Sequence, residues 1–224
     1  MHPLDRPIWS ALRTRQKHFA VANDRAARFQ SDVEPFAATA DDSPESMAAL
    51  GKLLQPNDIV VLLQTTASPC PPGAKIEAVT PGVQMVLDKL IAPKGHARIE
   101  ELTAADTPAM IDLATLTKPG PFLARTHDLG TFWGVRENGR LIAMAGERMK
   151  LPGLTEVSGV CTHPDFRGQG LAAILSHHVA TSILGRGETP FLHAYASNHA
   201  AISVYEALGF RLARQMLVTV LTGT

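Results

Sequence analysis

The stretch that decides the fold is Glu156-Val157-Ser158-Gly159-Val160-Cys161-Thr162-His163-Pro164-Asp165-Phe166-Arg167-Gly168-Gln169-Gly170-Leu171-Ala172. Residues 155–162 have the composition of a buried strand, and residues 168–184 have the apolar spacing of an amphipathic helix. The glycines remove side chains where the helix begins, and there the backbone N–H groups are unpaired and the helix dipole is positive. Such a turn predicts a phosphate or pyrophosphate site, to which Arg167 adds a positive charge.

Two familiar phosphate-binding motifs fit this turn poorly. A Walker P-loop needs Lys followed by Ser or Thr after its last glycine, and Leu171-Ala172 stand there instead. A dinucleotide-binding turn needs a third glycine or alanine, here Ala173, and an acidic residue about twenty positions further on. Glu188 lies near that distance, but in a glycine-rich turn rather than at the end of a strand.

A third interpretation also accounts for the residues downstream, because the chain resembles the GNAT acyltransferase superfamily in two places. The first is the superfamily's acyl-CoA pyrophosphate loop, matched by His163-Pro164 and by Arg167-Gly168-Gln169-Gly170-Leu171-Ala172. The second is its later signature, matched by Asn198, Ala200-Ala201-Ile202, Tyr205 and Leu208-Gly209-Phe210. Both matches occur in the right order with one strand between them, and together they predict a GNAT acyltransferase domain over residues 96–224.

The order of predicted elements from residue 97 onward indicates an α/β (α+β) fold with a mixed central sheet. Asn138-Gly139 between two strand-like runs predicts a hairpin, and residues 190–196, 198–208 and 210–221 predict a strand, a helix and an extended segment. The resemblance implies a GNAT-like sheet flanked by helices, in which the fourth and fifth strands splay apart and open a wedge.

Residues 1–95 are expected to form an N-terminal α/β half-domain. Ser43-Pro44 predicts a helix start, Ile59–Leu63 a strand buried on both faces, and residues 67–73 a loop. Residues 82–91 are interpreted as a short helix or a buried segment, which Pro93-Lys94-Gly95 closes. Two-part members of the superfamily, including the glycine N-acyltransferase-like branch, place a degenerate half-domain before the active one, and residues 1–95 are interpreted as such a half.

The resemblance implies acetyl-CoA as co-substrate and assigns residues to it. The pantetheine arm would pair with the backbone of Val160, Cys161 and Thr162, as an added strand. The pyrophosphate would lie on the turn, and Asn198 is both a cofactor contact and an expected helix N-cap. The residues assigned to the pyrophosphate turn are Arg167, Gly168, Gln169, Gly170, Leu171 and Ala172.

Direct acyl transfer to an amine needs a proton donor for the leaving thiolate and a base for the amine. Tyr205 occupies the position of the family's general acid. Glu156 and His193 are the two candidates for the base, and Glu156 is slightly favoured. Each also has an ordinary structural interpretation: Tyr205 as a packed helix residue, His193 as a hydrogen-bonded strand residue and Glu156 as a solvated charge at a strand end.

Charge and composition exclude several other classes of protein. The chain of 224 residues carries 21 Lys and Arg against 21 Asp and Glu, a balance that predicts no nucleic-acid partner and no membrane-surface partner. Two cysteines, Cys70 and Cys161, and the side-by-side pair His177-His178 do not make a metal site, so no metal is expected. The lack of a signal-like start or a long apolar run predicts a cytoplasmic protein. A monomer or a homodimer is expected.

The function predicted from the sequence is the transfer of an acetyl or short acyl group from acyl-CoA to a primary amine, on a small molecule or a peptide N-terminus. The alternative is an inactive CoA-binding module with a regulatory or interaction role. Residues 118–128 form the loop expected to meet the acceptor, and Arg125, His127 and Asp128 are its polar candidates.

Overall fold

The computed structural model describes residues 2–224, and one mixed sheet runs through the whole molecule. Only β9 and β10 pair in parallel, and all other neighbours in this sheet are antiparallel. The predicted mixed α/β fold is therefore confirmed. The eight strands, in spatial order, are β4 (Ile59–Gln64), β11 (Phe210–Gly223), β5 (Ala74–Leu87), β10 (Thr189–Tyr195), β9 (Leu154–Thr162), β8 (Arg140–Leu151), β7 (Phe132–Glu137) and β6 (Glu100–Leu102).

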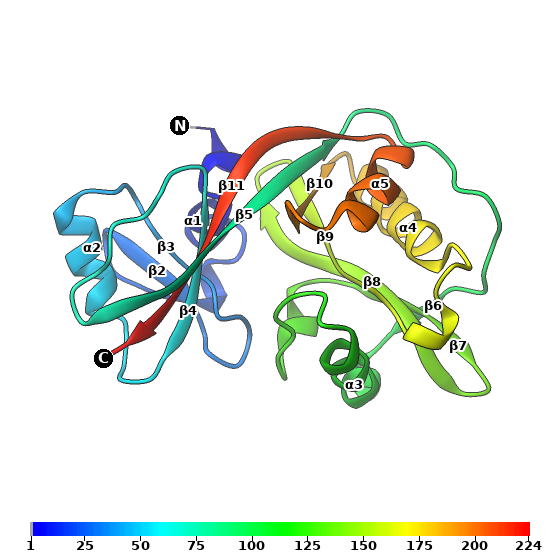
Figure 1. Ribbon diagram of the computed structural model, residues 1–224, viewed down its shortest axis with the longest axis horizontal. Coiled ribbons are helices and arrows are strands. Elements are labelled where there is room, and N and C mark those ends of the chain that lie inside the picture. The colour runs from blue at the N-terminus through cyan, green and yellow to red at the C-terminus, as the bar shows by residue number, and fades with distance from the viewer. Residues whose placement is uncertain (1) are drawn as a thin grey trace.

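Helices cover both faces of this sheet around β8, β9 and β10, and most residues of these three strands are buried or half-buried. Helices α4 (Leu171–Gly185) and α5 (His199–Ala207) lie on one face, and Val179 and Ile183 of α4 are fully buried there. The other face carries α3 (Thr107–Thr117) and the N-terminal lobe (Figure 1). No helix within residues 2–224 has the length and hydropathy that crossing a lipid bilayer requires.

The N-terminal lobe packs directly on the central sheet. Ile8 and Leu12 share one core with Phe191 of β10 and Met216 of β11. The lobe consists of η1 (Pro3–Asp5), α1 (Pro7–Arg13), η2 (Lys17–Phe19), a three-stranded sheet of β1 (Ala20–Ala22), β2 (Ala26–Phe29) and β3 (Ala37–Thr39), α2 (Pro44–Gly51) and strand β4 of the central sheet. The Ser43 side chain accepts a hydrogen bond from the Ser46 amide, so the predicted start of α2 is confirmed.

Strands β5 and β11 are the two longest and run from one lobe to the other (Figure 1). They pair antiparallel from Ala74–Gly223 to Leu87–Phe210, and β5 also pairs with β10. The alternative of a helix over residues 82–91 is therefore wrong, because residues 82–87 complete β5. The predicted boundary at residues 95 and 96 lies in the connection after β5, whereas β5 itself belongs to the sheet of the second half.

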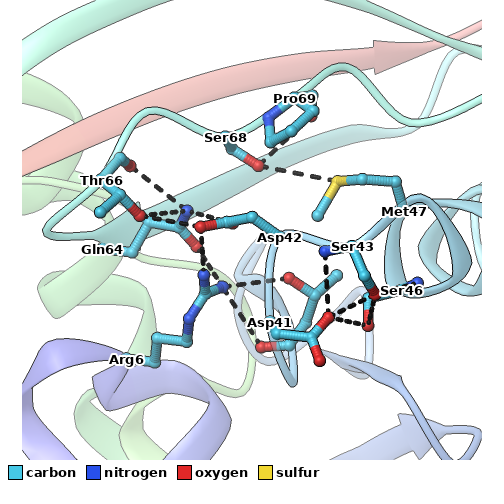
Figure 2. Close-up of polar contacts among 11 residues, drawn as sticks. Arg6, Asp41, Asp42, Ser43, Ser46, Met47, Gln64, Thr66, Ser68 and Pro69 are labelled. Atoms are coloured by element: carbon cyan, nitrogen blue, oxygen red, sulfur yellow. Dashed lines mark hydrogen bonds and ion pairs between the residues drawn. The ribbon is translucent and has the colours of Figure 1, made fainter. Parts of the chain in front are cut away.

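A cluster of polar side chains holds the start of α1 against the rest of the N-terminal lobe (Figure 2). Arg6 is buried, and its guanidinium donates to Gln64 Oε1 at 2.8 Å and pairs with Asp42 at 2.6 Å. Asp41 accepts hydrogen bonds from the hydroxyls of Ser43 and Ser46. The polar groups of this cluster satisfy one another's hydrogen-bonding capacity, so we assign the cluster a structural role.

Gly209 supplies a stability prediction for the junction between β5 and α5. It has φ of 94° after the last residues of α5, and a Cβ there would lie 1.8 Å from the carbonyl oxygen of Lys89. We expect Gly209→Ala to lower the free energy of unfolding by about 2 kcal/mol or more, from backbone strain and this overlap. Urea unfolding measures the change.

Gly185→Ala is the matched control, because Gly185 ends α4 with negative φ and open space around its Cβ position. That variant should match the wild-type stability or exceed it slightly. Equal stability of Gly209→Ala and wild type would show that the chain connecting β5 to β6 does not pack against Gly209 as described.

Candidate active site

A cleft opens where β9 and β10 diverge. The two strands pair only from Leu154 to Glu156 on β9, against Thr189 to Phe191 on β10. Beyond this point β10 continues against β5 and β9 continues against β8. The edge of β9 that faces β10 is therefore unpaired over residues 157–162, and a cavity of about 580 Å³ lies beside it. The backbone N–H and C=O groups along this edge of β9 are free to bind an extended ligand as an added strand.

A bulge shapes β9 inside the cleft. Met144 of β8 pairs with Cys161 and Gly146 pairs with Ser158, so Gly159 and Val160 oppose a single residue of β8. Gly159 has φ of 63°, and a Cβ there would lie 2.9 Å from the Phe132 ring. The bulge turns the backbone of residues 159 and 160 out of the ladder toward the cleft.

The glycine-rich turn stands at one end of the cleft. Gly168 and Gly170 have φ of 80° and 76°, and no side chain caps the first amides of the 15-residue helix α4. Arg167, Gly168, Gly170, Leu171 and Ala172 line the cleft, whereas Gln169 does not. Unpaired amides, a positive helix dipole and an arginine thus converge on one place, an arrangement that binds phosphate groups.

Helix α5 contributes two of the predicted residues to the same cleft. The Asn198 side chain accepts a hydrogen bond from the Ala201 amide at 3.2 Å, so its N-cap role is confirmed. Tyr205 is buried and lines the cleft, and burial raises the pKa of its phenol well above the ordinary value. Cys161 also lines the cleft, and burial raises the pKa of its thiol to about 11. Both groups therefore keep their protons at neutral pH, so Tyr205 presents a protonated phenol to the cleft and Cys161 is a poor nucleophile.

Glu156 is fully buried behind the cleft rather than solvated at the strand end. Arg148 donates a hydrogen bond from Nε to Glu156 Oε2 and another from Nη2 to Glu156 Oε1, each at 2.9 Å. Glu156 Oε1 also lies 2.7 Å from His193 Nδ1. Burial works to raise the pKa of Glu156, but the charge of Arg148 and the hydrogen bonds outweigh it and lower the pKa to about 2. A carboxylate with that pKa is a weak base, and its contacts suit it to orienting its two partners.

His193 lines the cleft on β10, and both of its ring nitrogens have partners. Nδ1 faces Glu156, and Nε2 lies 2.9 Å from Gln84 Nε2. Gln84 Nε2 also donates to the carbonyl oxygen of Leu4, and this fixes it as the amide nitrogen of the side chain. His193 is thus held as the tautomer that donates from Nδ1 and accepts at Nε2.

Arg148 is a cleft residue that the sequence did not reveal. It lies on β8 with its guanidinium 4.7 Å above the ring of Phe36, which lines the same cleft from the N-terminal lobe. Its pairing with Glu156 crosses two strands whose register is shifted by bulges, and no sequence spacing predicts such a contact. Of the loop expected to meet the acceptor, residues 118–121 line the cleft, whereas Arg125, His127 and Asp128 do not.

Glu34 is a second buried carboxyl near this network. Its side chain is fully buried, neither oxygen has a hydrogen-bond partner among the described residues, and burial raises its pKa from 4.5 to about 8. An unfolded chain releases this proton near pH 4.5 and the folded chain near pH 8. The free energy of unfolding should therefore fall by about 1.4 kcal/mol per pH unit across that window.

Glu34→Gln removes this pH dependence, because glutamine stays neutral. We expect the variant to lie within about 1 kcal/mol of wild type near pH 5 and to exceed its stability by about 4 kcal/mol at pH 8. Urea unfolding at pH 5, 6.5 and 8 measures the difference, with the exposed Glu101→Gln as control. A gain that does not grow with pH would mean that Glu34 is ionised in the folded chain.

Comparisons with known proteins agree with this geometry. The family model described as FR47-like protein matches residues 132–218, which include β9, the turn and α5. A [ribosomal protein bS18]-alanine N-acetyltransferase of Escherichia coli strain K12 is 37% identical over 75 residues, which are 33% of this chain and 50% of that protein. The chain therefore spans about half the length of the curated relatives it matches.

Several solved structures match nearly the whole chain. A GNAT-family protein from Novosphingobium aromaticivorans DSM 12444 is 44% identical, with a TM-score of 0.93 over 100% of both chains. A GCN5-related N-acetyltransferase from Kribbella flavida is 20% identical over 96% of this chain and 92% of that chain, with a TM-score of 0.65. The first match extends through the N-terminal lobe as well as the cleft, and the second shows that the fold is shared.

Proposed function

The chain belongs to the GNAT family of acetyltransferases, and on that premise we propose that it transfers an acetyl group from acetyl-CoA directly to a primary amine. The observation that carries this proposal is the cleft itself. An unpaired strand edge, a bare helix N-terminus and a buried tyrosine line one continuous cavity. Acetyl-CoA has a part for each feature: the thioester would lie near the tyrosine, the extended pantetheine arm along the strand edge and the pyrophosphate at the helix N-terminus.

The co-substrate would bind by its backbone contacts and its charge. The pantetheine arm pairs with Val160, Cys161 and Thr162, whose edge has no strand partner on the β10 side. The pyrophosphate accepts hydrogen bonds from the amides that open α4 and pairs with Arg167. Asn198 borders the same cavity from α5.

The reaction moves an acyl group and two protons. The amine attacks the thioester carbon, and a backbone N–H near the bulge at Val160 stabilises the negative oxygen of the tetrahedral intermediate. The C–S bond then breaks, and Tyr205 donates its proton to the departing thiolate. The proton lost by the amine leaves toward a base or to water.

We infer that His193, rather than Glu156, receives the amine's proton. Glu156 is committed to Arg148 and has a pKa of about 2, whereas the His193 imidazole lines the cleft and its Nε2 can accept a proton. Proton uptake at His193 Nε2 requires the Gln84 amide to give up its hydrogen bond to the Leu4 carbonyl and to turn its oxygen toward the ring. Glu156 would then hold the imidazole in place and stabilise its positive charge, as a positioning residue.

The finer assignments follow from the same premise. We propose a cytoplasmic protein, because acetyl-CoA is an intracellular metabolite and both cysteines are free thiols. The acceptor is an amine of a small molecule or of a peptide N-terminus, and no metal takes part. The N-terminal lobe precedes the half of the chain that carries the cleft, and this order supports an architecture of two parts like that of the glycine N-acyltransferase-like branch.

Thiol release from acetyl-CoA, measured across a panel of amines, amino acids and peptides, tests the proposed function. Mass spectrometry of the product should show an added acetyl group on the amine. The alternative, an inactive CoA-binding module, predicts tight CoA binding by calorimetry with no thiol release for any acceptor.

A further inference from the structure

We propose that the acceptor carries a carboxylate close to its amine, that Arg148 binds this carboxylate, and that an apolar part of the acceptor packs against the N-terminal lobe. The inference rests on the proposed acyl transfer and names the substrate class of that site. In chemical terms, the acceptor is an apolar amino acid or an analogue of one.

The first observation behind this proposal is the charge of the residues that line the cleft. Its charged lining residues are Lys118, Arg148 and Arg167, and no aspartate or glutamate lines it among the described residues. Arg167 stands beside the turn assigned to the pyrophosphate, so Lys118 and Arg148 remain for the rest of the cavity. Glu156 balances the charge of Arg148 from outside the cavity, but every charged side chain that an acceptor meets in the lining is a cation, and this favours an acceptor that carries an anionic group.

The second observation is the way in which the Arg148 guanidinium is held at the cleft. Glu156 takes its Nε and Nη2, and Phe36 covers one face of the guanidinium. Nη1 donates to no described residue and faces the loop at Gly120, where even an added methyl group would lie 3.9 Å away. Arg148 is thereby fixed with one pair of N–H donors directed at the cleft, a preorganised site for a carboxylate oxygen.

The third observation is the apolar wall of the cleft. The wall next to Arg148 comes from both halves of the chain: Phe36, Val61 and Leu63 from the N-terminal lobe, and Val218 and Val220 from β11. The Val61 amide bonds to the carbonyl oxygen of Pro35, which ties this wall to the segment that carries Phe36. An aliphatic side chain on the acceptor would bury its surface there, which a small polar amine would not.

Matched acceptors test the proposal with the full chain. Leucine, leucinamide and isoamylamine share one aliphatic group, but only leucine has a carboxylate. We expect kcat/KM for leucine to exceed that for each of the other two by about 10–100-fold, the range of one charged hydrogen bond in a buried site. Calorimetry with N-acetylleucine and N-acetylleucinamide, in the presence of CoA, should show the same preference in binding alone.

Two variants connect the preference to the site. Arg148→Lys keeps the charge but loses the fixed fork, and it should bring the ratio of leucine to leucinamide close to one. Val61→Asp leaves Arg148 and Glu156 untouched and adds a negative charge to the half-buried wall, so it should favour isoamylamine over leucine. Acetyl-CoA binding by each variant confirms that it is folded.

The outcomes separate this inference from the proposed function. Equal or faster transfer to isoamylamine by the wild type, or an unchanged ratio in both variants, overturns the role of Arg148 while acyl transfer stands. A lack of transfer to every amine and peptide, with acetyl-CoA bound, overturns the proposed function and the substrate class with it.

Discussion

Tyr205→Phe is expected to lower kcat by about 100-fold or more while leaving the Kd for acetyl-CoA within about twofold of wild type. The phenol is buried in the cleft with a raised pKa, so it holds the proton that the thiolate needs. Phenylalanine fills the same space and keeps the packing of α5, but it has no proton to give. Steady-state kinetics and calorimetry measure the two quantities separately.

Tyr195→Phe is the matched control for this experiment. The chain has two tyrosines, and Tyr195 also lines the cleft, on the half-exposed end of β10. Its loss should change kcat by less than about threefold. If Tyr205→Phe retains wild-type kcat, or if Tyr195→Phe shows the larger loss, Tyr205 is not the general acid.

Gly170→Glu is expected to weaken acetyl-CoA binding by about 100-fold or more. Gly170 is the residue before α4, and a glutamate there brings a negative charge to the amides assigned to the pyrophosphate. The position has φ of 76° and no atom closer than 3.9 Å to a Cβ, so the side chain has room. Calorimetry with acetyl-CoA measures the affinity.

Gly170→Ala is the control, because it imposes the same backbone strain of about 1 kcal/mol without the charge or the length. It should bind acetyl-CoA within about tenfold of wild type. Equal binding by Gly170→Glu and Gly170→Ala, in folded proteins, would remove the pyrophosphate from the turn.

Local sequence signals predicted those parts of the fold that depend on a few adjacent residues. Asn138 and Gly139 have φ of 50° and 81° between β7 and β8, as the hairpin they predict requires. The start of α2 at Ser43 and the N-cap at Asn198 follow the same logic. Residues 82–91 were ambiguous because both faces of β5 are buried beyond Gly82, and an apolar run without alternation does not separate strand from helix.

Some residues of the candidate site could likewise be predicted from local motifs, and others could not. The turn at residues 167–172 and Tyr205 lie within motifs that can be read along the chain. Arg148 and Phe36 reach the cleft only through the pairing of distant strands and the packing of the N-terminal lobe. Glu156 was predicted as a solvated charge or a base, and its burial against Arg148 depends on that same long-range packing.

A crystal structure of the protein with bound CoA tests the central claim most directly. We expect the pyrophosphate on the amides of residues 168–172, and the pantetheine arm hydrogen-bonded to the backbone of Val160–Thr162 with its sulfur near Tyr205. CoA bound elsewhere on the molecule, or a cleft that stays free of it at saturating concentration, would contradict the account.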